Sequence, residues 1–199
     1  MAIQVTTSGE RNELSVPQTV LDGGWGSIIL EGNDNRIEIA EPAEVGHLHI
    51  ELSGGSSLRI GPGCILRNLF VYACDRGSVR IGGQTGFNGL VRLLLHEQGA
   101  IEIGSGCLFG GDTDLTISDM HSILDAATGE RLNRARSICV ADRVWVGQKA
   151  TLLKGVSIGG ESVIAAGAVV TGAVPSGCIA AGNPARVVRE GVTWRHELI

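Results

Sequence analysis

The stretch VADRVWVGQKATLLKGVSIGGESVIAAGAVVT, residues 140–171, decides the fold of this 199-residue chain. An aliphatic residue returns at every sixth position, six times in succession, at Val140, Val146, Leu152, Ile158, Ile164 and Val170. A period of six fits neither the 3.6-residue turn of a helix nor the two-residue alternation of a strand. It is typical of a β-solenoid in which each hexapeptide supplies one short strand and one corner.

A second stripe of side chains supports this fold. A small or modest residue stands four positions after each aliphatic, at Val144, Ala150, Val156, Ser162, Ala168 and Val174. We expect the aliphatics to point inward and the smaller residues to let the chain turn close to its neighbour. Three repeats would close a coil of 18 residues, stacked on the next at about 4.8 Å. Several coils must stack, because one coil cannot bury its own apolar face.

The upstream half repeats more loosely. Related phrases place Ile37, Leu58, Val79 and Ile101 at steps of 21, 21 and 22 residues. These steps predict wider coils, with corners at 32–35, 54–56 and 82–83. We therefore predict one all-β domain over 1–199, divided into an N-terminal cap (1–30), irregular coils (31–117), an extruded loop (118–136), regular coils (137–182) and a C-terminal helix and tail (183–199).

The C-terminal segment reads as a short helix. Asn183 followed by Pro184 resembles a helix N-cap with proline in the first turn. The helix would run over 185–190, stop at Gly191 and cover the last coil, with Trp194 packed beneath it.

Charge and composition exclude several classes of function. The net charge is −5 with both signs interspersed, which argues against nucleic-acid binding. Residues 1–16 lack the pattern of a signal peptide, and no apolar run reaches the roughly 18 residues of a membrane-spanning helix, so we expect a cytoplasmic protein.

None of the five cysteines forms a CxxC pair. We expect Cys64 and Cys107, which follow the similar phrases IGPG and IGSG, to be buried thiols.

The loop over 118–136 contains the first candidate catalytic residue. Its sequence, SDMHSILDAATGERLNRAR, breaks the repeat, and long insertions in compact repeats are usually functional. His121 could serve as a general base there, or be only an exposed surface histidine. If the segment is extended, Asp119 lies on the same side and could orient the imidazole. Arg131, Arg134 and Arg136 could meet a carboxylated sugar or be plain solvated charge.

The remaining candidate site residues with aromatic rings are one tryptophan and four histidines. Trp145 precedes the inward Val146, so we expect an outward indole that either stacks in a cofactor groove or packs against a neighbouring subunit. His47, His49, His96 and His196 lack the spacing of a zinc-dependent carbonic anhydrase, and we interpret them as surface residues.

From about residue 105 to 190 the sequence resembles the hexapeptide-repeat O-acetyltransferases, which include maltose, galactoside and capsular-polysaccharide acetyltransferases. The resemblance rests on SDMH (118–121), GERLN (129–133), VWVG (144–147), LLKGVSIGGESVIAAGAVVT (152–171) and AAGNPARVVR (180–189). The stretch TISDMHSILDAATGERLN is most similar to sialic-acid capsule O-acetyltransferases. Residues 1 to about 100 share only the coil character.

The resemblance implies a left-handed parallel β-helix that forms a homotrimer, with acetyl-CoA bound in grooves between subunits. By position it implies catalytic roles for His121 and Trp145. It implies contacts to the coenzyme from Gly147, Gln148, Ala166, Thr171, Gly172 and Arg189. In one departure, the familiar VTKD has become VTGA, so Gly172 replaces a lysine that often meets the coenzyme.

The sequence thus predicts an acetyl-CoA-dependent O-acetyltransferase that acts on a carbohydrate, such as a bacterial surface polysaccharide or its sugar precursor, without a metal. Two alternatives stay open. One is an N-acetyltransferase of a nucleotide-linked amino sugar. The other is a non-catalytic scaffold or binding module, against which the joint presence of the loop histidine and the coenzyme-turn residues argues.

Overall fold

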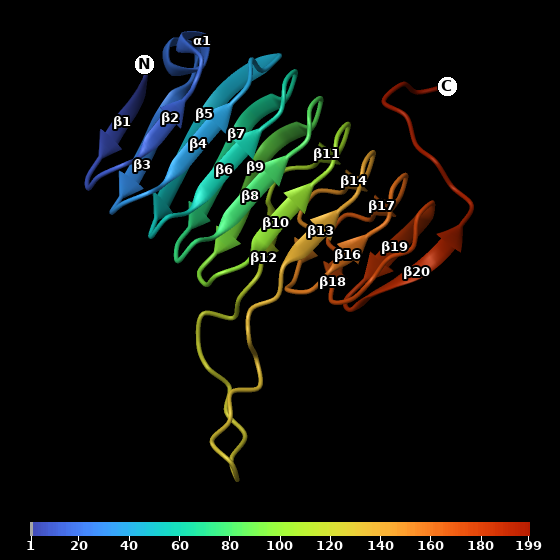
Figure 1. Ribbon diagram of the computed structural model, residues 1–199. Coiled ribbons are helices and arrows are strands. Elements are labelled where there is room, and N and C mark those ends of the chain that lie inside the picture. Colours follow the sequence, from blue (N-terminus) through green and yellow to red (C-terminus); the bar gives the residue numbers. More distant parts are fainter. Residues whose placement is uncertain (1) are drawn as a thin grey trace.

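The hexapeptide stretch forms the C-terminal coils of a β-solenoid in a computed structural model that describes residues 2–199 (Figure 1). Each aliphatic of the repeat ends a short strand. These strands are β13 (Ile138–Val140), β14 (Trp145–Val146), β15 (Thr151–Leu152), β16 (Ser157–Ile158), β17 (Val163–Ile164) and β18 (Val169–Val170). Val140 pairs with Ile158, and Val146 with Ile164, in parallel register. Three strands and 18 residues therefore make one coil, as the spacing predicts.

Both stripes of the repeat point into the solenoid. The six aliphatics are buried, and so are the residues four positions after them. The one polar member of the second stripe, Ser162, donates its hydroxyl to the carbonyl of Pro175 at 2.7 Å. Among residues 2–199, no buried side-chain nitrogen or oxygen lacks a hydrogen-bond partner. The narrow interior is thus filled by ladders of like side chains, one above another along the axis.

The N-terminal coils are wider because one long strand takes the place of two short ones. The long strands are β3 (Trp25–Glu31), β5 (Glu44–Ser53), β7 (Ile65–Ala73) and β9 (Gly86–Leu95). They alternate with β4 (Arg36–Ile39), β6 (Ser57–Ile60), β8 (Ser78–Ile81) and β10 (Ala100–Ile103). Ile37, Leu58, Val79 and Ile101 are in register across the short strands, which confirms the predicted steps.

The long face divides in two at β9. This strand pairs with both β11 (Leu108–Phe109) and β12 (Thr113–Thr116). The turn between β11 and β12 contains Asp112, whose φ of 59° lies in the left-handed region. The C-terminal coils repeat this break at every level, because β14 and β17 continue below β11 while β15 and β18 continue below β12. From here to the C-terminus the solenoid has three faces.

The first residues continue the coil, although no hexapeptide period is visible in them. β1 (Ile3–Thr7) pairs with β3, and β2 (Glu13–Ser15) pairs with β4. The helix α1 (Gln18–Gly23) follows and buries Val20 against the core. Only Ile3 of β1 is buried, so this coil carries too few inward apolar residues to show a period.

The predicted C-terminal helix is wrong. Residues 185–190 form β20 (Ala185–Glu190), which pairs antiparallel with β19 (Cys178–Gly182). β19 lies at the end of the parallel sheet and would otherwise leave a row of unpaired backbone groups. The β-branched Val187 and Val188 favour pairing with that edge over a helix of six residues. Trp194 accordingly does not pack beneath a helix.

The extruded loop leaves the solenoid between β12 and β13 (Figure 1). Val140 is paired with Ile103, 37 positions earlier, whereas the next coil needs only 18. The difference of 19 residues equals the length of the segment 118–136. The insertion therefore projects from one corner without disturbing the register of the stack.

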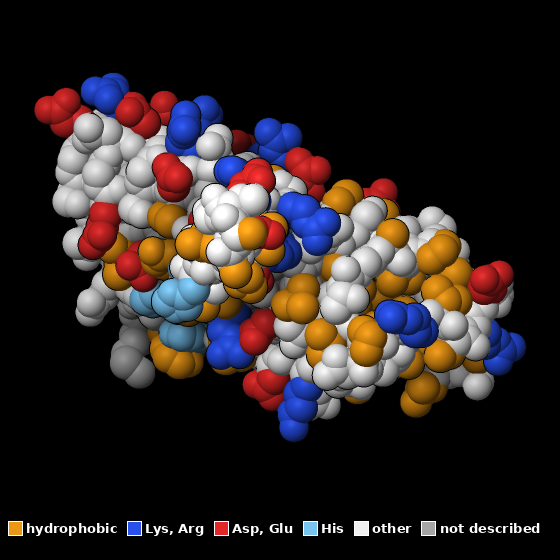
Figure 2. Space-filling model, turned by 90° about the horizontal axis from the view of Figure 1, so that it is seen from below, with side chains coloured by type: hydrophobic (Ala, Val, Ile, Leu, Met, Phe, Trp, Pro, Cys, Tyr) orange, Lys and Arg blue, Asp and Glu red, His pale blue; other side chains and the backbone are white. Residues whose placement is uncertain are grey.

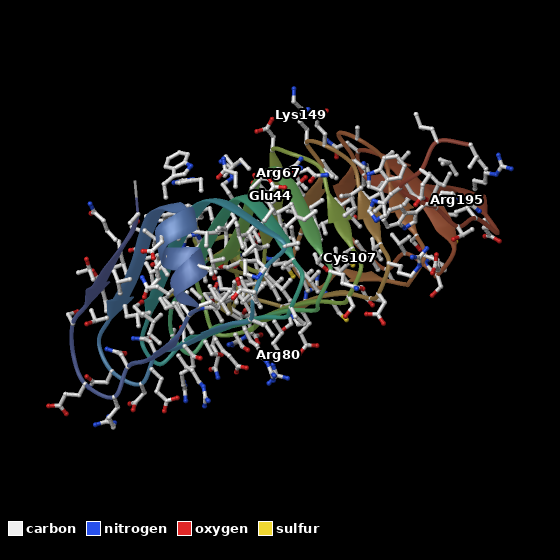
Figure 3. The ribbon with its side chains drawn as sticks, turned by 90° about the horizontal axis from the view of Figure 1, so that it is seen from above. Glu44, Arg67, Arg80, Cys107, Lys149 and Arg195 are labelled. Atoms are coloured by element: carbon white, nitrogen blue, oxygen red, sulfur yellow. The ribbon has the colours of Figure 1, made fainter. Side chains whose placement is uncertain are left out.

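The two cysteines at equivalent corners are buried, as expected. Cys64 donates its thiol to the carbonyl of Gly82 at 3.3 Å, and Cys107 to that of Ala141 at 3.2 Å. Burial raises the pKa of the Cys107 thiol to about 11. Cys107 lies within the coils in Figure 3, where Arg80 and Lys149 project outward. Both thiols are structural, because a buried thiol with a raised pKa is a poor nucleophile.

The ladder predicts the effect of truncating one inward side chain. Ile158→Ala should lower the free energy of unfolding by about 2–5 kcal/mol, because it leaves a cavity between stacked coils. The neighbouring Ser157→Ala, on the exposed side of the same strand, should change it by about 0.5 kcal/mol or less. Urea unfolding of both variants gives the comparison. Equal effects would contradict the inward assignment.

Candidate functional site

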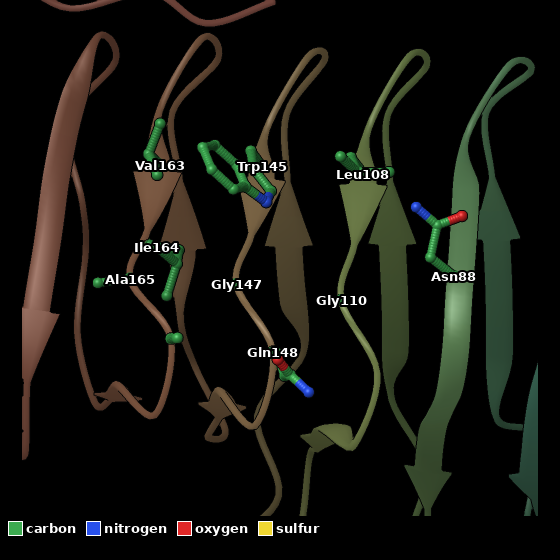
Figure 4. A pocket seen from close by; sticks show the side chains of 10 residues that line it. Asn88, Leu108, Gly110, Trp145, Gly147, Gln148, Val163, Ile164 and Ala165 are labelled. Atoms are coloured by element: carbon green, nitrogen blue, oxygen red, sulfur yellow. The ribbon is translucent and has the colours of Figure 1, made fainter. Parts of the chain in front are cut away.

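A groove of about 510 Å³ runs along the outside of β11, β14 and β17 (Figure 4). Four of the predicted residues line it: Trp145, Gly147, Gln148 and Ala166. Its other lining residues are Asn88, Leu108, Gly110, Val163, Ile164 and Ala165. None of these six was predicted to line a site, although 163–165 lie within the motif over 152–171, because the six belong to three different coils. The groove presents backbone and small side chains around one large indole.

Trp145 points outward, as the repeat predicts, and is 41% exposed. Its ring lies 6.1 Å from that of Trp194. Trp194 is itself buried and donates its indole N–H to the carbonyl of Arg143 at 2.6 Å. The tail thus supports one side of Trp145 and leaves the other open to the groove.

The glycine at 147 is required by the stacking of coils. A Cβ at this position would lie 2.6 Å from the backbone nitrogen of Ala166 in the next coil. No such need exists at Gly172, where a Cβ would meet open space. Backbone geometry therefore accounts for Gly147 by itself, whereas nothing in the fold explains glycine in place of lysine at 172.

Thr171 and Gly172 lie at a different corner. They line a smaller cavity of about 200 Å³ together with Val187 and Arg186 of β20. Arg186 is exposed and was not singled out from the sequence, although it belongs to the quoted motif AAGNPARVVR. Arg189 lies on the exposed hairpin, opposite Ile179. The structure thus places a cation other than the predicted Arg189, namely Arg186, next to Gly172, the position where the resemblance implies a lysine.

The loop holds His121 in a tight turn. Met120 has a φ of 61°, and the backbone N–H of His121 donates to the carbonyl of Asp119 at 2.7 Å. The segment is therefore not extended, and the premise that put Asp119 and His121 on one side is wrong. The Asp119 carboxylate instead accepts hydrogen bonds from Asn133 at 2.8 Å and from Lys154. The Lys154 ammonium holds the pKa of Asp119 below its ordinary value.

The neck of the loop is tied to the solenoid by a second ion pair. Arg131 donates two hydrogen bonds to Glu97, at 2.7 and 2.6 Å, and Ser118 donates a third at 2.5 Å. These donors lower the pKa of Glu97 to about 2, with Arg131 the largest cause. Arg131 is thus engaged within the chain. Arg134 and Arg136 line a cavity of about 560 Å³ beside the neck.

Known proteins resemble this chain in sequence and in fold. No protein-family model matches the chain. A polysialic acid O-acetyltransferase of Neisseria meningitidis is 27% identical over 148 residues, which cover 74% of this chain and 68% of the relative. One from Escherichia coli O1:K1 is 34% identical over 94 residues, 47% of this chain and 31% of the relative. The crystal structure of the polysialic-acid-specific acetyltransferase NeuO superimposes with a TM-score of 0.71 at 27% identity, over 98% of this chain and 73% of that one.

The chain is thus similar in sequence to polysialic acid and galactoside O-acetyltransferases, and similar in fold to NeuO. Both the extruded loop and a groove are present in the structure of this chain. His121 is not among the residues that line the groove within this chain. The groove with Trp145 extends to the corner after β14 and β17, whereas Thr171 lies at the corner after β18 and His121 in the loop that leaves the equivalent corner between β12 and β13. One face of the prism separates these two corners.

The outer surface of that same sheet carries a patch of rings farther toward the N-terminus. We call it the ring face; it consists of Trp25, His47, His49, Phe70, Tyr72 and His96. The rings lie in pairs with centroids 4.1 to 4.8 Å apart, of which His49 and Phe70 are stacked and the other two pairs are tilted, and Trp25 is 51% exposed. Figure 2 shows histidine and apolar side chains gathered on the side from which the loop protrudes. Within the described part of the chain, no group of three His, Cys, Asp or Glu residues could hold a metal ion, and no helix is long and apolar enough to span a membrane.

The Glu97–Arg131 ion pair predicts that the neck of the loop loses stability in acid. The pKa of Glu97 in the folded chain, about 2, is below its ordinary value of 4.5. The pair therefore contributes its full stability above about pH 4.5 and loses it as the pH falls toward 2. Glu97→Gln should lower the melting temperature at pH 7, and the difference from wild type should shrink below pH 4.

A matched control is Glu102→Gln on β10, whose carboxylate makes no ion pair within residues 2–199. Its melting temperature should follow that of the wild type from pH 7 to 3. A Glu97→Gln difference that does not change with pH would contradict the ion-pair assignment.

Proposed function

We propose that this protein is an acetyl-CoA-dependent O-acetyltransferase that acts on a carbohydrate of a bacterial surface polysaccharide or its sugar precursor. One observation carries the proposal. A chain 27% identical over three quarters of its length to a polysialic acid O-acetyltransferase keeps both an extruded histidine loop and an indole-lined groove. The donor would be found in the cytoplasm, where we place the enzyme.

In the proposed reaction, the His121 imidazole removes the proton of a sugar hydroxyl as the oxygen attacks the thioester carbonyl. The tetrahedral intermediate then collapses, the C–S bond breaks, and the coenzyme thiolate takes the proton back from the imidazolium. An oxyanion formed in this way needs a hydrogen-bond donor. The Trp145 indole N–H is a candidate, because it donates to no acceptor within residues 2–199. The thioester is already activated, so no metal is required.

We propose that the acetyl-CoA site is completed by a second copy of the chain. Gly147, Gln148 and Ala166 of one copy would face Thr171, Gly172 and Arg189 of the next. Because both corners border the face formed by β12, β15 and β18, a closed ring of copies brings them together when that face turns toward the axis. A homotrimer satisfies this arrangement. It would also bury the ring face, which supports the proposal because large exposed apolar patches usually mark interfaces.

The acceptor is the less constrained substrate. Arg134 and Arg136 beside the neck are suited to a sugar carboxylate, as in the polysialic acid on which the named relatives act.

The two alternative functions, an N-acetyltransferase and a non-catalytic scaffold, can be distinguished from the proposed one by experiment. An N-acetyltransferase would acetylate amino sugars in place of hydroxyls, and a scaffold would neither transfer acetyl nor gain thermal protection from CoA. Assays with labelled acetyl-CoA across neutral, amino and sialylated sugars decide among these functions.

His121→Ala should lower the rate of acetyl transfer by at least about 100-fold, because the general base is removed. The fold should persist, since His121 is exposed and its side chain donates to no residue of the described chain. Transfer of radiolabelled acetyl and a circular-dichroism melting curve give the two measurements. A variant that acetylates at the wild-type rate would remove His121 from the mechanism.

A site shared between copies predicts complementation. His121→Ala and Trp145→Ala should each be nearly inactive alone. Mixed assemblies should regain activity, because in a mixed homotrimer-like ring about one site in three would pair an intact His121 with an intact Trp145 from the neighbouring copy. Co-expression of the two variants with different tags, followed by tandem purification, isolates the mixture.

The control is a chain that carries both substitutions, co-expressed with either single variant. That mixture cannot form a complete site and should stay inactive. Absence of activity from the first mixture would place both residues within one copy, whereas activity in the control would show that the residue missing from both of its chains is not required.

A further inference from the structure

Asn133 occupies the neck of the loop, where the two halves of the insertion run antiparallel. Its residue surface is 8% exposed. The side-chain Nδ2 donates to the Asp119 carboxylate at 2.8 Å and to the backbone carbonyl of His121 at 2.7 Å. The side-chain Oδ1 accepts the backbone N–H of Ile123 at 2.7 Å. The one side-chain amide of Asn133 therefore hydrogen-bonds to Asp119, His121 and Ile123, which are every second residue around the candidate general base.

The backbone alone does not hold this part of the loop. In the described chain, the two halves exchange a backbone hydrogen bond at the base, from Arg136 to Ile117, and the next from Leu132 to Ile123. Between these two rungs the segment with His121 has no cross-strand backbone bond. The Asn133 amide takes the place of the missing rungs, since a side-chain amide offers both a donor and an acceptor.

Two charged side chains connect this clamp to the solenoid. Lys154, in the corner after β15, bonds the Asp119 carboxylate and approaches the Asn133 carbonyl at 3.3 Å. Arg131, two positions before Asn133, is held by Glu97 at the end of β9. These two side chains fix Asn133 relative to the strands of the solenoid. Through Asn133 they also fix the backbone of His121.

We propose that Asn133 is a positioning residue that sets the direction of the His121 imidazole. It touches neither substrate; it acts through the carbonyl of His121 and the turn that begins at Asp119. The inference rests on the proposed acetyl transfer, in which His121 is the base. A shift of the imidazole by about 1 Å is enough to cost roughly 100-fold in rate.

The test compares Asn133→Ala with Asn12→Ala. Asn12 is a matched asparagine in the first coil, where its amide donates to the carbonyls of Ser8 and Gly32 at 3.0 and 2.8 Å. Both variants should lose thermal stability. Only Asn133→Ala should lose kcat, by about 10- to 100-fold, with the KM for acetyl-CoA changed less than about threefold.

A rescue experiment separates orientation from stability. Asn133→Asp keeps the acceptor for Ile123 but sets a second carboxylate against Asp119, so its kcat should fall at least as far as that of Asn133→Ala. Adding Asp119→Asn restores one donor and one acceptor between the two side chains and should recover part of the kcat. Absence of recovery would overturn the role of the Asp119–Asn133 bond.

Trypsin gives a readout that needs no activity. Its sites at Arg134 and Arg136 should be cut faster in Asn133→Ala than in Asn12→Ala, because the neck opens locally. If the wild type acetylates sugars while Asn133→Ala keeps its kcat or is cut no faster, this inference is overturned and the proposed function stands. If the wild type acetylates none of the sugars, the proposed function fails and the positioning role falls with it.

Discussion

Close parallel stacking of successive coils is the constraint on which the rest of the structure depends. Each backbone must approach the next to strand spacing, so the interior accepts only ladders of aliphatic or small side chains. The corners are equally restricted, as at Gly147, where a side chain would collide with the backbone of Ala166. A stack built in this way tolerates little change inside it, and variation is confined to what projects from the corners.

The extruded loop shows how such variation is accommodated. Nineteen residues leave between β12 and β13, yet Val140 still pairs in register with Ile103. Outside the stack, polar contacts replace the hydrophobic ladder. The Glu97–Arg131 pair and the Asn133 amide connect the loop to the coils with directional bonds, which hold a backbone more specifically than apolar packing does. In the proposed mechanism His121 needs this kind of support, because its loop is otherwise exposed.

The prism also accounts for the proposed division of the site between copies. Its corners are separated by flat faces, so residues at two corners cannot converge on one ligand within the same coil stack. Trp145 lies on the face formed by β11, β14 and β17, whereas His121 lies in the loop that follows β12 of the next face. The ring face continues this sheet toward the N-terminus, where Trp25 leaves half of its surface uncovered. Both features are consistent with an enzyme whose sites form between copies.

The sequence alone determined the solenoid, its coil lengths and the place of the loop, because a six-residue period and steps of 21 and 22 residues leave a direct trace in the order of side chains. Motif likeness likewise indicated Trp145, Gly147, Gln148 and Ala166, which do share one groove. Only the tertiary structure decided that residues 185–190 pair as a strand, since the reason is an unpaired edge contributed by another segment. It also decided that Asp119 bonds Asn133 and Lys154 and that the segment from Asp119 to His121 is a turn. Such contacts join residues 14 to 35 positions apart, and no local pattern records them.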